Sequence, residues 1–132
     1  MEFVRADICS DMPAGQFDNI VCDSALEHFT RAEIATLLAD VRTRLHREGV
    51  FSGHTIMARP DGIKSLPHLE YEFKGKEDLL AVLTPYFRHV TVFETIYPTR
   101  HNLYFWASDG RVPFRHDWPN LVTEHWHAAP GA

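Results

Sequence analysis

The sequence lacks the features that mark several specialised classes of protein. Its 132 residues contain no apolar run long enough to span a membrane, and the N-terminus lacks the basic and apolar regions of a secretion signal. The net charge of −5 disfavours nucleic-acid binding through bulk electrostatics. We therefore expect a cytoplasmic protein with no nucleic-acid partner and no membrane association.

Cysteine is also scarce, since the chain contains only Cys9 and Cys22. Two cysteines in an intracellular chain are expected to be free thiols, and we assign them no chemistry. With 45% hydrophobic and 23% charged residues, the chain has apolar content for one compact core and no room for two separate ones.

The first clear structural signal lies in residues 17–56. The apolar run Ile20-Val21-Cys22 is typical of a buried strand, and the chain then becomes polar at residues 23–24. Thr30 is a candidate N-cap with Glu33 as its capping-box partner, and Gly49 marks the expected end of the helix. A second apolar strand is expected over 50–56. This order predicts a strand, helix, strand unit with a right-handed parallel crossover.

The remaining segments continue the pattern. Residues 57–70 are punctuated by proline and glycine and are expected to form a loop. A helix is expected at about 76–84, followed by strands at about 89–97 and 101–108. We expect residues 1–108 to form one domain and residues 109–132 to be a tryptophan-containing C-terminal extension. The extension is expected to pack on that domain or on a partner.

These residues, in this order, resemble class I S-adenosylmethionine-dependent methyltransferases. Residues 17–21, with Leu26-Glu27-His28, resemble the fourth strand of that family and the start of the helix that follows it. Residues 45–51 resemble the end of this helix and the fifth strand. Residues 3–8 resemble the third strand, and 71–108 the last helix and closing strand pair, so about residues 2–108 are covered. The resemblance implies an α/β fold: a truncated Rossmann-like sheet with strands corresponding to 3, 4, 5, 7 and 6, with flanking helices.

The chain departs from this family at the cofactor. The resemblance implies S-adenosylmethionine, which the family binds with a glycine-rich loop after the first strand and an acid after the second. This sequence contains no Gly-x-Gly, and only a few residues precede the third-strand match. We therefore interpret the chain as the C-terminal half of the family fold and expect no cofactor to bind the isolated chain.

Five residues are candidates for binding the cofactor. The resemblance implies that Asp7 accepts from the adenine amino group and that Ile8 covers the ring, although an aspartate that caps a turn is the alternative. Ser24, Ala25 and Leu26 follow the carboxyl end of a strand, where ligands bind in open α/β sheets.

Glu27 and His28 are the candidate catalytic residues, because an adjacent carboxylate and imidazole can act as a general base or as metal ligands. Some methyltransferases hold a divalent ion with Glu-x-x-Glu-His, but Ser24 replaces the first Glu, so we expect no metal. The alternative is a helix-leading Glu and a partly exposed His. His125 and His127 are expected to be surface histidines that bind zinc only with further ligands. The remaining basic side chains are expected to be scattered and solvated: Arg5, Arg42, Arg44 and Arg47.

Three functional interpretations stay open at this point. The chain is a truncated, non-catalytic binding or interaction module, or a methyltransferase completed in trans by a partner chain that supplies the missing half, or a fragment of a longer methyltransferase. We favour the first. The strand at 20–22 would lose its family neighbour and become an edge without proline or lysine. Residues 3–8, the tryptophan-containing extension or a second subunit could cover it, and we expect a homodimer with 20–22 or 3–8 at the interface.

Overall fold

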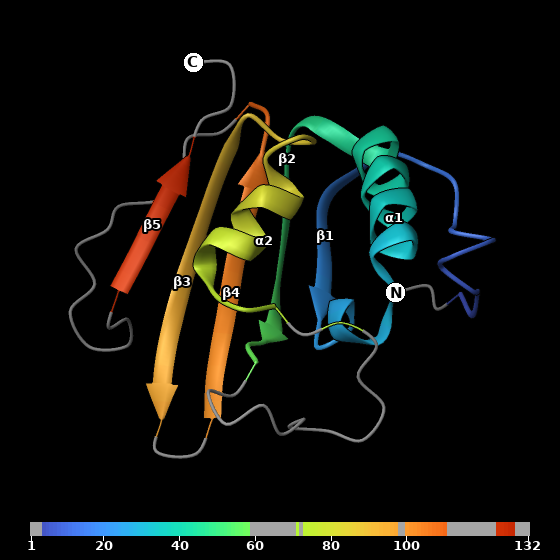
Figure 1. Ribbon diagram of the computed structural model, residues 1–132. Helices are drawn as coiled ribbons and strands as arrows, with labels where there is room; N and C mark the ends of the chain where they lie inside the picture. Colours follow the sequence, from blue (N-terminus) through green and yellow to red (C-terminus); the bar gives the residue numbers. More distant parts are fainter. Residues whose placement is uncertain (1–3, 59–70, 72, 98–99, 111–123, 129–132) are drawn as a thin grey trace.

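A computed structural model describes residues 4–58, 71, 73–97, 100–110 and 124–128 of the chain. These residues form two α-helices, five β-strands and one 3-10 turn (Figure 1). In chain order the elements are β1 (Phe17–Asp23), the 3-10 turn (Leu26–His28), α1 (Arg31–Arg44), β2 (Leu45–Ile56), α2 (Lys76–Leu83), β3 (His89–Tyr97), β4 (Arg100–Ser108) and β5 (Glu124–Ala128).

The strands form one sheet in the order β1-β2-β4-β3-β5. β1 and β2 run parallel and are joined through α1, whereas the β2–β4, β4–β3 and β3–β5 pairs are antiparallel. The predicted strand, helix, strand unit and the closing antiparallel pair are both confirmed. The fold is therefore α/β, with the sheet of a truncated Rossmann-like domain extended by β5 at one edge.

Helix α1 begins where the sequence predicts. The Thr30 hydroxyl accepts a hydrogen bond from the Glu33 N–H at 3.2 Å, and the Thr30 N–H donates to Glu33 Oε1 at 2.9 Å, which completes the capping box. Four apolar residues at helical spacing then face the core: Ile34, Leu37, Leu38 and Val41.

The predicted end of this helix at Gly49 is wrong, because α1 ends at Arg44 and Leu45 already begins β2. Leu45 has extended backbone angles, and its N–H closes the helix by donating to the Val41 carbonyl. Gly49 has a different role. A Cβ at Gly49 would lie 2.9 Å from Leu45 Cγ and 3.0 Å from the Asp18 carbonyl oxygen, so glycine allows β2 to approach its surroundings closely.

The expected strand at residues 3–8 is also wrong within the described residues. Residues 4–6 have no regular structure, and a turn follows in which the Asp7 carbonyl accepts from the N–H groups of Ser10 and Asp11. In the family order 3-2-1-4-5-7-6, the third strand pairs only with the second. The described residues contain no such second strand, and a strand without a partner leaves its backbone groups unpaired.

Both helices lie on one face of the sheet (Figure 1). Alternate strand residues on that face are buried against them, among them Phe51, Val90, Val92, Leu103 and Phe105. The strand positions between these point to the opposite face, which carries the exposed Val21 and Tyr104. The core therefore lies between one face of the sheet and the two helices, and no described helix covers the other face.

Gly53 is expected to be the position in β2 that is least tolerant of a side chain. A Cβ there would collide with the Cys22 carbonyl group and lie 2.8 Å from Phe105 Cζ. We expect Gly53→Ala to lower the free energy of unfolding by about 3 kcal/mol, because the backbone of β1 cannot move away without losing its pairing with β2. Urea unfolding measures the change. Ser52→Ala, at the neighbouring half-buried position, is the control and is expected to change stability little.

Candidate functional site

The carboxyl ends of β1 and β2 bring together the most reactive polar side chains of the described chain. Ser24 immediately follows β1, and its N–H donates to the His54 carbonyl on β2 at 2.9 Å. The φ angle of Ser24 is +53°, the left-handed region that non-glycine residues rarely adopt. This conformation turns the chain sharply out of the sheet, and such strain is concentrated at functional sites.

His54 is the centre of this group. Its Nε2 donates to Asn102 Oδ1 at 2.8 Å, because an amide oxygen only accepts. In the neutral ring Nδ1 then accepts from the Ser24 hydroxyl at 2.9 Å, whereas only a protonated Nδ1 could pair with Asp23 Oδ1, which lies 3.3 Å away. The imidazole also packs against the Tyr104 ring, with centroids 4.9 Å apart. This arrangement fixes the ring and allows a proton to move between the Ser24 hydroxyl and the imidazole.

Glu27 and His28, the predicted catalytic pair, lie in one 3-10 turn but in different environments. Glu27 is completely buried, and its Oε2 accepts from the Thr55 hydroxyl at 2.9 Å. Among the described residues no donor reaches Glu27 Oε1. His28, in contrast, is exposed. The structure therefore does not bring the two side chains into one shared site, and the burial of the Glu27 carboxylate was not predicted from the sequence.

The predicted cofactor residues fall into two groups. Ser24, Ala25 and Leu26 lie at the carboxyl end of β1, and Leu26 is completely buried in the core. Asp7 and Ile8 lie instead beside α1: Asp7 Oδ1 accepts from the Cys9 N–H at 2.9 Å, and Ile8 packs against the core. Within the described residues, no hydrogen bond connects Asp7 with the Ser24 group.

From the sequence, the arginines were expected to be scattered, but the structure brings some of them together. Arg42 and Arg47 line the same cavity, together with Arg88. Arg44 turns the other way, and its guanidinium donates to the carbonyls of Pro13 and Met12 at 2.8 and 3.2 Å. Arg44 therefore connects the N-terminal segment to α1 by hydrogen bonds, whereas Arg42, Arg47 and Arg88 line the cavity.

Metal ligation has no support in the described part of the chain, where no three His, Cys, Asp or Glu residues cluster. His125 and His127 lie on β5, and their side chains are outside the described part.

Among the residues that the structure describes, no helix is long and apolar enough to cross a membrane.

Both cysteines are free thiols, as predicted. Burial raises the pKa of the Cys22 thiol from 9.0 to about 11, with a further contribution from the nearby carboxylates of Glu27 and Asp23. The pKa of the Cys9 thiol is also raised, first by desolvation and then by Glu33 and Asp7. Neither environment produces the reactive thiolate that catalysis requires.

We expect Cys22 to react slowly with alkylating agents in a Cys9→Ser background. A pKa of about 11 reduces the thiolate fraction at pH 8 roughly 100-fold relative to an ordinary thiol, and the thiolate is the reacting form. Iodoacetamide labelling followed by mass spectrometry measures the rate. Labelling should become fast in urea, and fast labelling of the native protein would contradict the buried position of this thiol.

Comparison with known proteins gives matches in structure only. No protein-family model matches the sequence, and no curated protein is similar to it in sequence. The DhpI–SAH complex aligns with a TM-score of 0.64 at 20% identity, covering 83% of this chain and 55% of DhpI. The S-adenosylmethionine-dependent methyltransferase SibL aligns at 0.58 and 18% identity, covering 79% of this chain and 34% of SibL.

A third similar structure is the O-methyltransferase of a trans-AT polyketide synthase from Brevibacillus brevis, in complex with S-adenosyl-L-homocysteine. Its TM-score is 0.57 at 11% identity, with 79% of this chain and 48% of that one covered. This chain thus spans between about a third and about a half of the length of the three proteins. The chain has a partial methyltransferase fold.

Proposed function

We propose that this chain is a truncated methyltransferase-like domain that is not catalytic alone and acts as an interaction module, binding a second copy of itself along the open edge of β1. The observation that carries the proposal is the position of β1. It is the last strand at its side of the sheet, and no described residue of the chain's own candidate partners pairs with it. Residues 4–8 form no strand, and β5 pairs with β3 at the opposite edge.

The hydrogen-bonding direction of β1 supports this proposal. Ser24 N–H points to β2, where it meets the His54 carbonyl. Because backbone groups alternate in direction along a strand, Cys22 and Ile20 also face β2. Asn19, Val21 and Asp23 then present their N–H and C=O groups to the open edge. An apolar edge strand without proline or lysine favours pairing with another strand.

The side chains of β1 fit the same interpretation. Val21 is 69% exposed and Phe17 is 40% exposed, although both lie in a strand. An antiparallel β1–β1 pair across a two-fold axis centred on Val21 would place Val21 opposite its copy and Asn19 opposite the partner's Asp23. Such a pair would keep the two Asp23 carboxylates apart, so no like charges would meet.

The cofactor side of the proposal rests on a poor fit between the residues and S-adenosylmethionine. The similar structures include two complexes with S-adenosylhomocysteine. In this chain Asp7 is engaged with the Cys9 N–H in a turn beside α1, and no Gly-x-Gly loop is present. We therefore assign Asp7, Ile8, Ser24, Ala25 and Leu26 no cofactor in the isolated chain, and we derive no methyl transfer from it.

Completion in trans is the second candidate, and the His54 group favours it. A fixed imidazole hydrogen-bonded to a hydroxyl at the carboxyl ends of parallel strands is placed where ligands bind in such sheets. This candidate predicts that S-adenosylhomocysteine binds only when a polypeptide encoded next to this chain is co-expressed with it. A cytoplasmic location, where free thiols persist, belongs to both candidates.

Multi-angle light scattering at micromolar concentration tests the first candidate. A dimer mass of about twice 15.2 kDa is expected for the purified chain. A monomer mass across that concentration range would contradict the proposal.

A further inference from the structure

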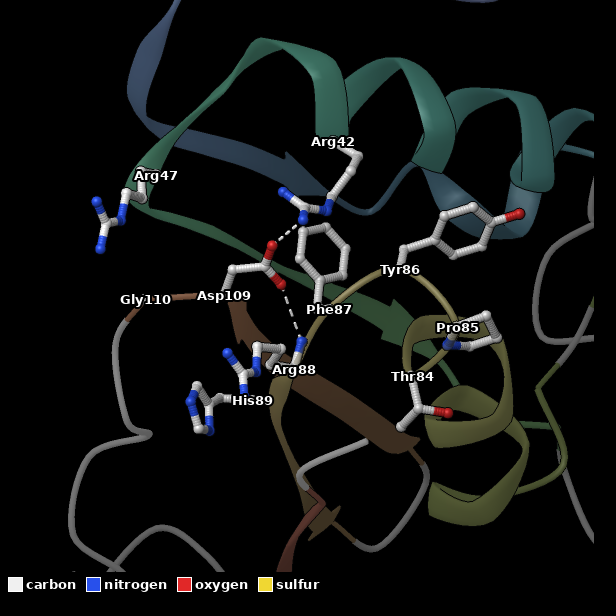
Figure 2. A pocket seen from close by; sticks show the side chains of 10 residues that line it. All are labelled: Arg42, Arg47, Thr84, Pro85, Tyr86, Phe87, Arg88, His89, Asp109 and Gly110. Atoms are coloured by element: carbon white, nitrogen blue, oxygen red, sulfur yellow. Dashed lines mark hydrogen bonds and ion pairs between the residues drawn. The ribbon is translucent and has the colours of Figure 1, made fainter. Parts of the chain in front are cut away.

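A large open cavity lies at the other end of the sheet from His54 (Figure 2). It has a volume of about 990 Å³ and is bounded by the end of α1, the start of β2, the turn between α2 and β3, and the end of β4. Along β2, Arg47 in its wall and His54 are separated by about 23 Å, because an extended strand rises roughly 3.3 Å per residue. The cavity is therefore distinct from the site at the carboxyl ends of β1 and β2.

The wall of this cavity carries more positive than negative charge. Arg42, Arg47 and Arg88 contribute guanidinium groups, and Asp109 is the one acid among the described lining residues. Asp109 is already engaged: it forms an ion pair with Arg42, and its Oδ1 accepts from the Arg88 backbone N–H at 3.0 Å (Figure 2). Among the described residues, no carboxylate pairs with the guanidinium of Arg47 or of Arg88. A chain with net charge −5 thus has a local positive site here.

Helix stabilisation explains only one of these arginines. Arg42 lies in the last turn of α1, where a cation offsets the negative end of the helix dipole. Arg47 comes from β2, and Arg88 from the turn before β3, so neither has this role. The packing beside Arg47 is close, because a Cβ on Gly110 would lie 2.7 Å from the Arg47 carbonyl oxygen and 3.0 Å from Glu48 Cγ. Gly110 thereby holds the end of β4, with Asp109, against the start of β2.

The other described lining residues are Pro85, Tyr86 and Phe87, together with the polar Thr84 and His89 and with Gly110. Tyr86 and Pro85 lie on the side away from Arg47 and Arg88, with Phe87 between them and the charged end (Figure 2). A ligand that fills the cavity would therefore place an anionic group at one end and an organic part at the other. A volume of this size is within the range of pockets that bind small organic molecules.

We propose that this cavity binds an organic phosphate, with Arg47 and Arg88 holding the phosphate and the Tyr86 side taking the organic part. Guanidinium groups bind phosphate oxygens through paired, charge-assisted hydrogen bonds. The cavity lies at the start of β2, whereas ligands of open α/β sheets bind at the carboxyl ends of the parallel strands. The proposal stands independently of the function of β1, because no residue of the cavity wall belongs to that strand.

Isothermal titration with ADP as the probe tests this proposal on the full chain. Saturable binding is expected, whereas adenosine, which has no phosphate, should bind at least about 10-fold more weakly. Arg47→Ala and Arg88→Ala should each weaken ADP binding roughly 10-fold or more. Arg5→Ala is the matched control, because it removes one positive charge at an exposed position outside the cavity and should leave ADP binding unchanged.

Three results would overturn the proposal. The first is no saturable ADP binding at millimolar concentration. The second is an equal loss in Arg5→Ala, which would reduce the effect to bulk charge. The third is tight binding of a polyglutamate peptide without binding of ADP, which would make the cavity a docking site for an acidic protein segment. Circular dichroism of each variant confirms that the fold is retained before its affinity is compared.

Discussion

Val21→Pro is expected to convert the dimer into a monomer without unfolding the chain. Proline has no N–H, and the N–H of Val21 points to the open edge of β1 rather than to β2. In a two-fold pair centred on Val21, both copies of this hydrogen bond would be lost together. At about 1.4 kcal/mol for each bond, the dimer dissociation constant should rise roughly 100-fold. Light scattering over a concentration series measures the change.

Two further variants separate backbone pairing from other effects. Val21→Ala keeps the N–H and should retain most of the dimer, since it removes only side-chain burial. Ile20→Pro removes an N–H that faces β2 and should instead destabilise the folded chain in urea unfolding. A monomer that results equally from Val21→Ala and Val21→Pro would show that side chains, and not the strand edge, form the interface.

The N-terminal segment offers an independent check of where the interface lies. Val4 is 60% exposed and precedes the turn at Asp7. Because residues 4–8 form no strand, Val4→Lys should leave the dimer intact, whereas Val21→Lys should disrupt it. The reverse result would move the interface to the N-terminal segment.

Local signals predicted most of the fold. The capping box of Thr30 and Glu33, and the apolar residues that follow it, depend only on residues close in sequence. The strands at 89–97 and 100–108 are joined by a short connection, so their pairing also requires little long-range information. Structure that depends on neighbours within one turn or one hairpin can be inferred from sequence patterns.

The errors concern segments that depend on distant partners. Residues 3–8 have the composition of a strand, but a strand exists only where another strand accepts its hydrogen bonds. Gly49 resembles a helix terminator, and it is instead a close-packing residue in β2. β5 was not predicted as a strand because its five residues show no strong alternation, and its pairing with β3 spans about thirty residues.

Only part of the candidate site could be predicted from the sequence. The sequence placed Ser24 beyond the carboxyl end of a strand, and in the structure Ser24 follows β1 there and contacts His54. His54 and Asn102 were missed because they lie far apart in sequence, on β2 and β4, and meet only through the sheet register that pairs Ile56 with Asn102. A parallel alignment of β1 with β2 would have placed His54 beside Asp23. The burial of Glu27 could not be inferred, since it depends on Thr55 and the packing around it.

The isolated chain is expected to bind S-adenosylhomocysteine no better than millimolar. A micromolar site corresponds to about −8 kcal/mol and a millimolar site to about −4 kcal/mol, so the difference equals three or four buried hydrogen bonds. The absent glycine loop and ribose-binding acid would supply at least that number.

Isothermal titration of the purified chain with S-adenosylhomocysteine tests this expectation, and DhpI, which forms a complex with that ligand, is a suitable positive control. Ser24→Ala serves as the matched variant, because Ser24 follows the carboxyl end of β1, where ligands bind in open α/β sheets. If any weak binding is non-specific, Ser24→Ala will leave it unchanged. Micromolar binding that Ser24→Ala weakens would show that the carboxyl ends of β1 and β2 hold the cofactor without a glycine loop. In that event the chain would be a methyltransferase in its own right, and the His54 imidazole would become its first candidate for an acid–base group.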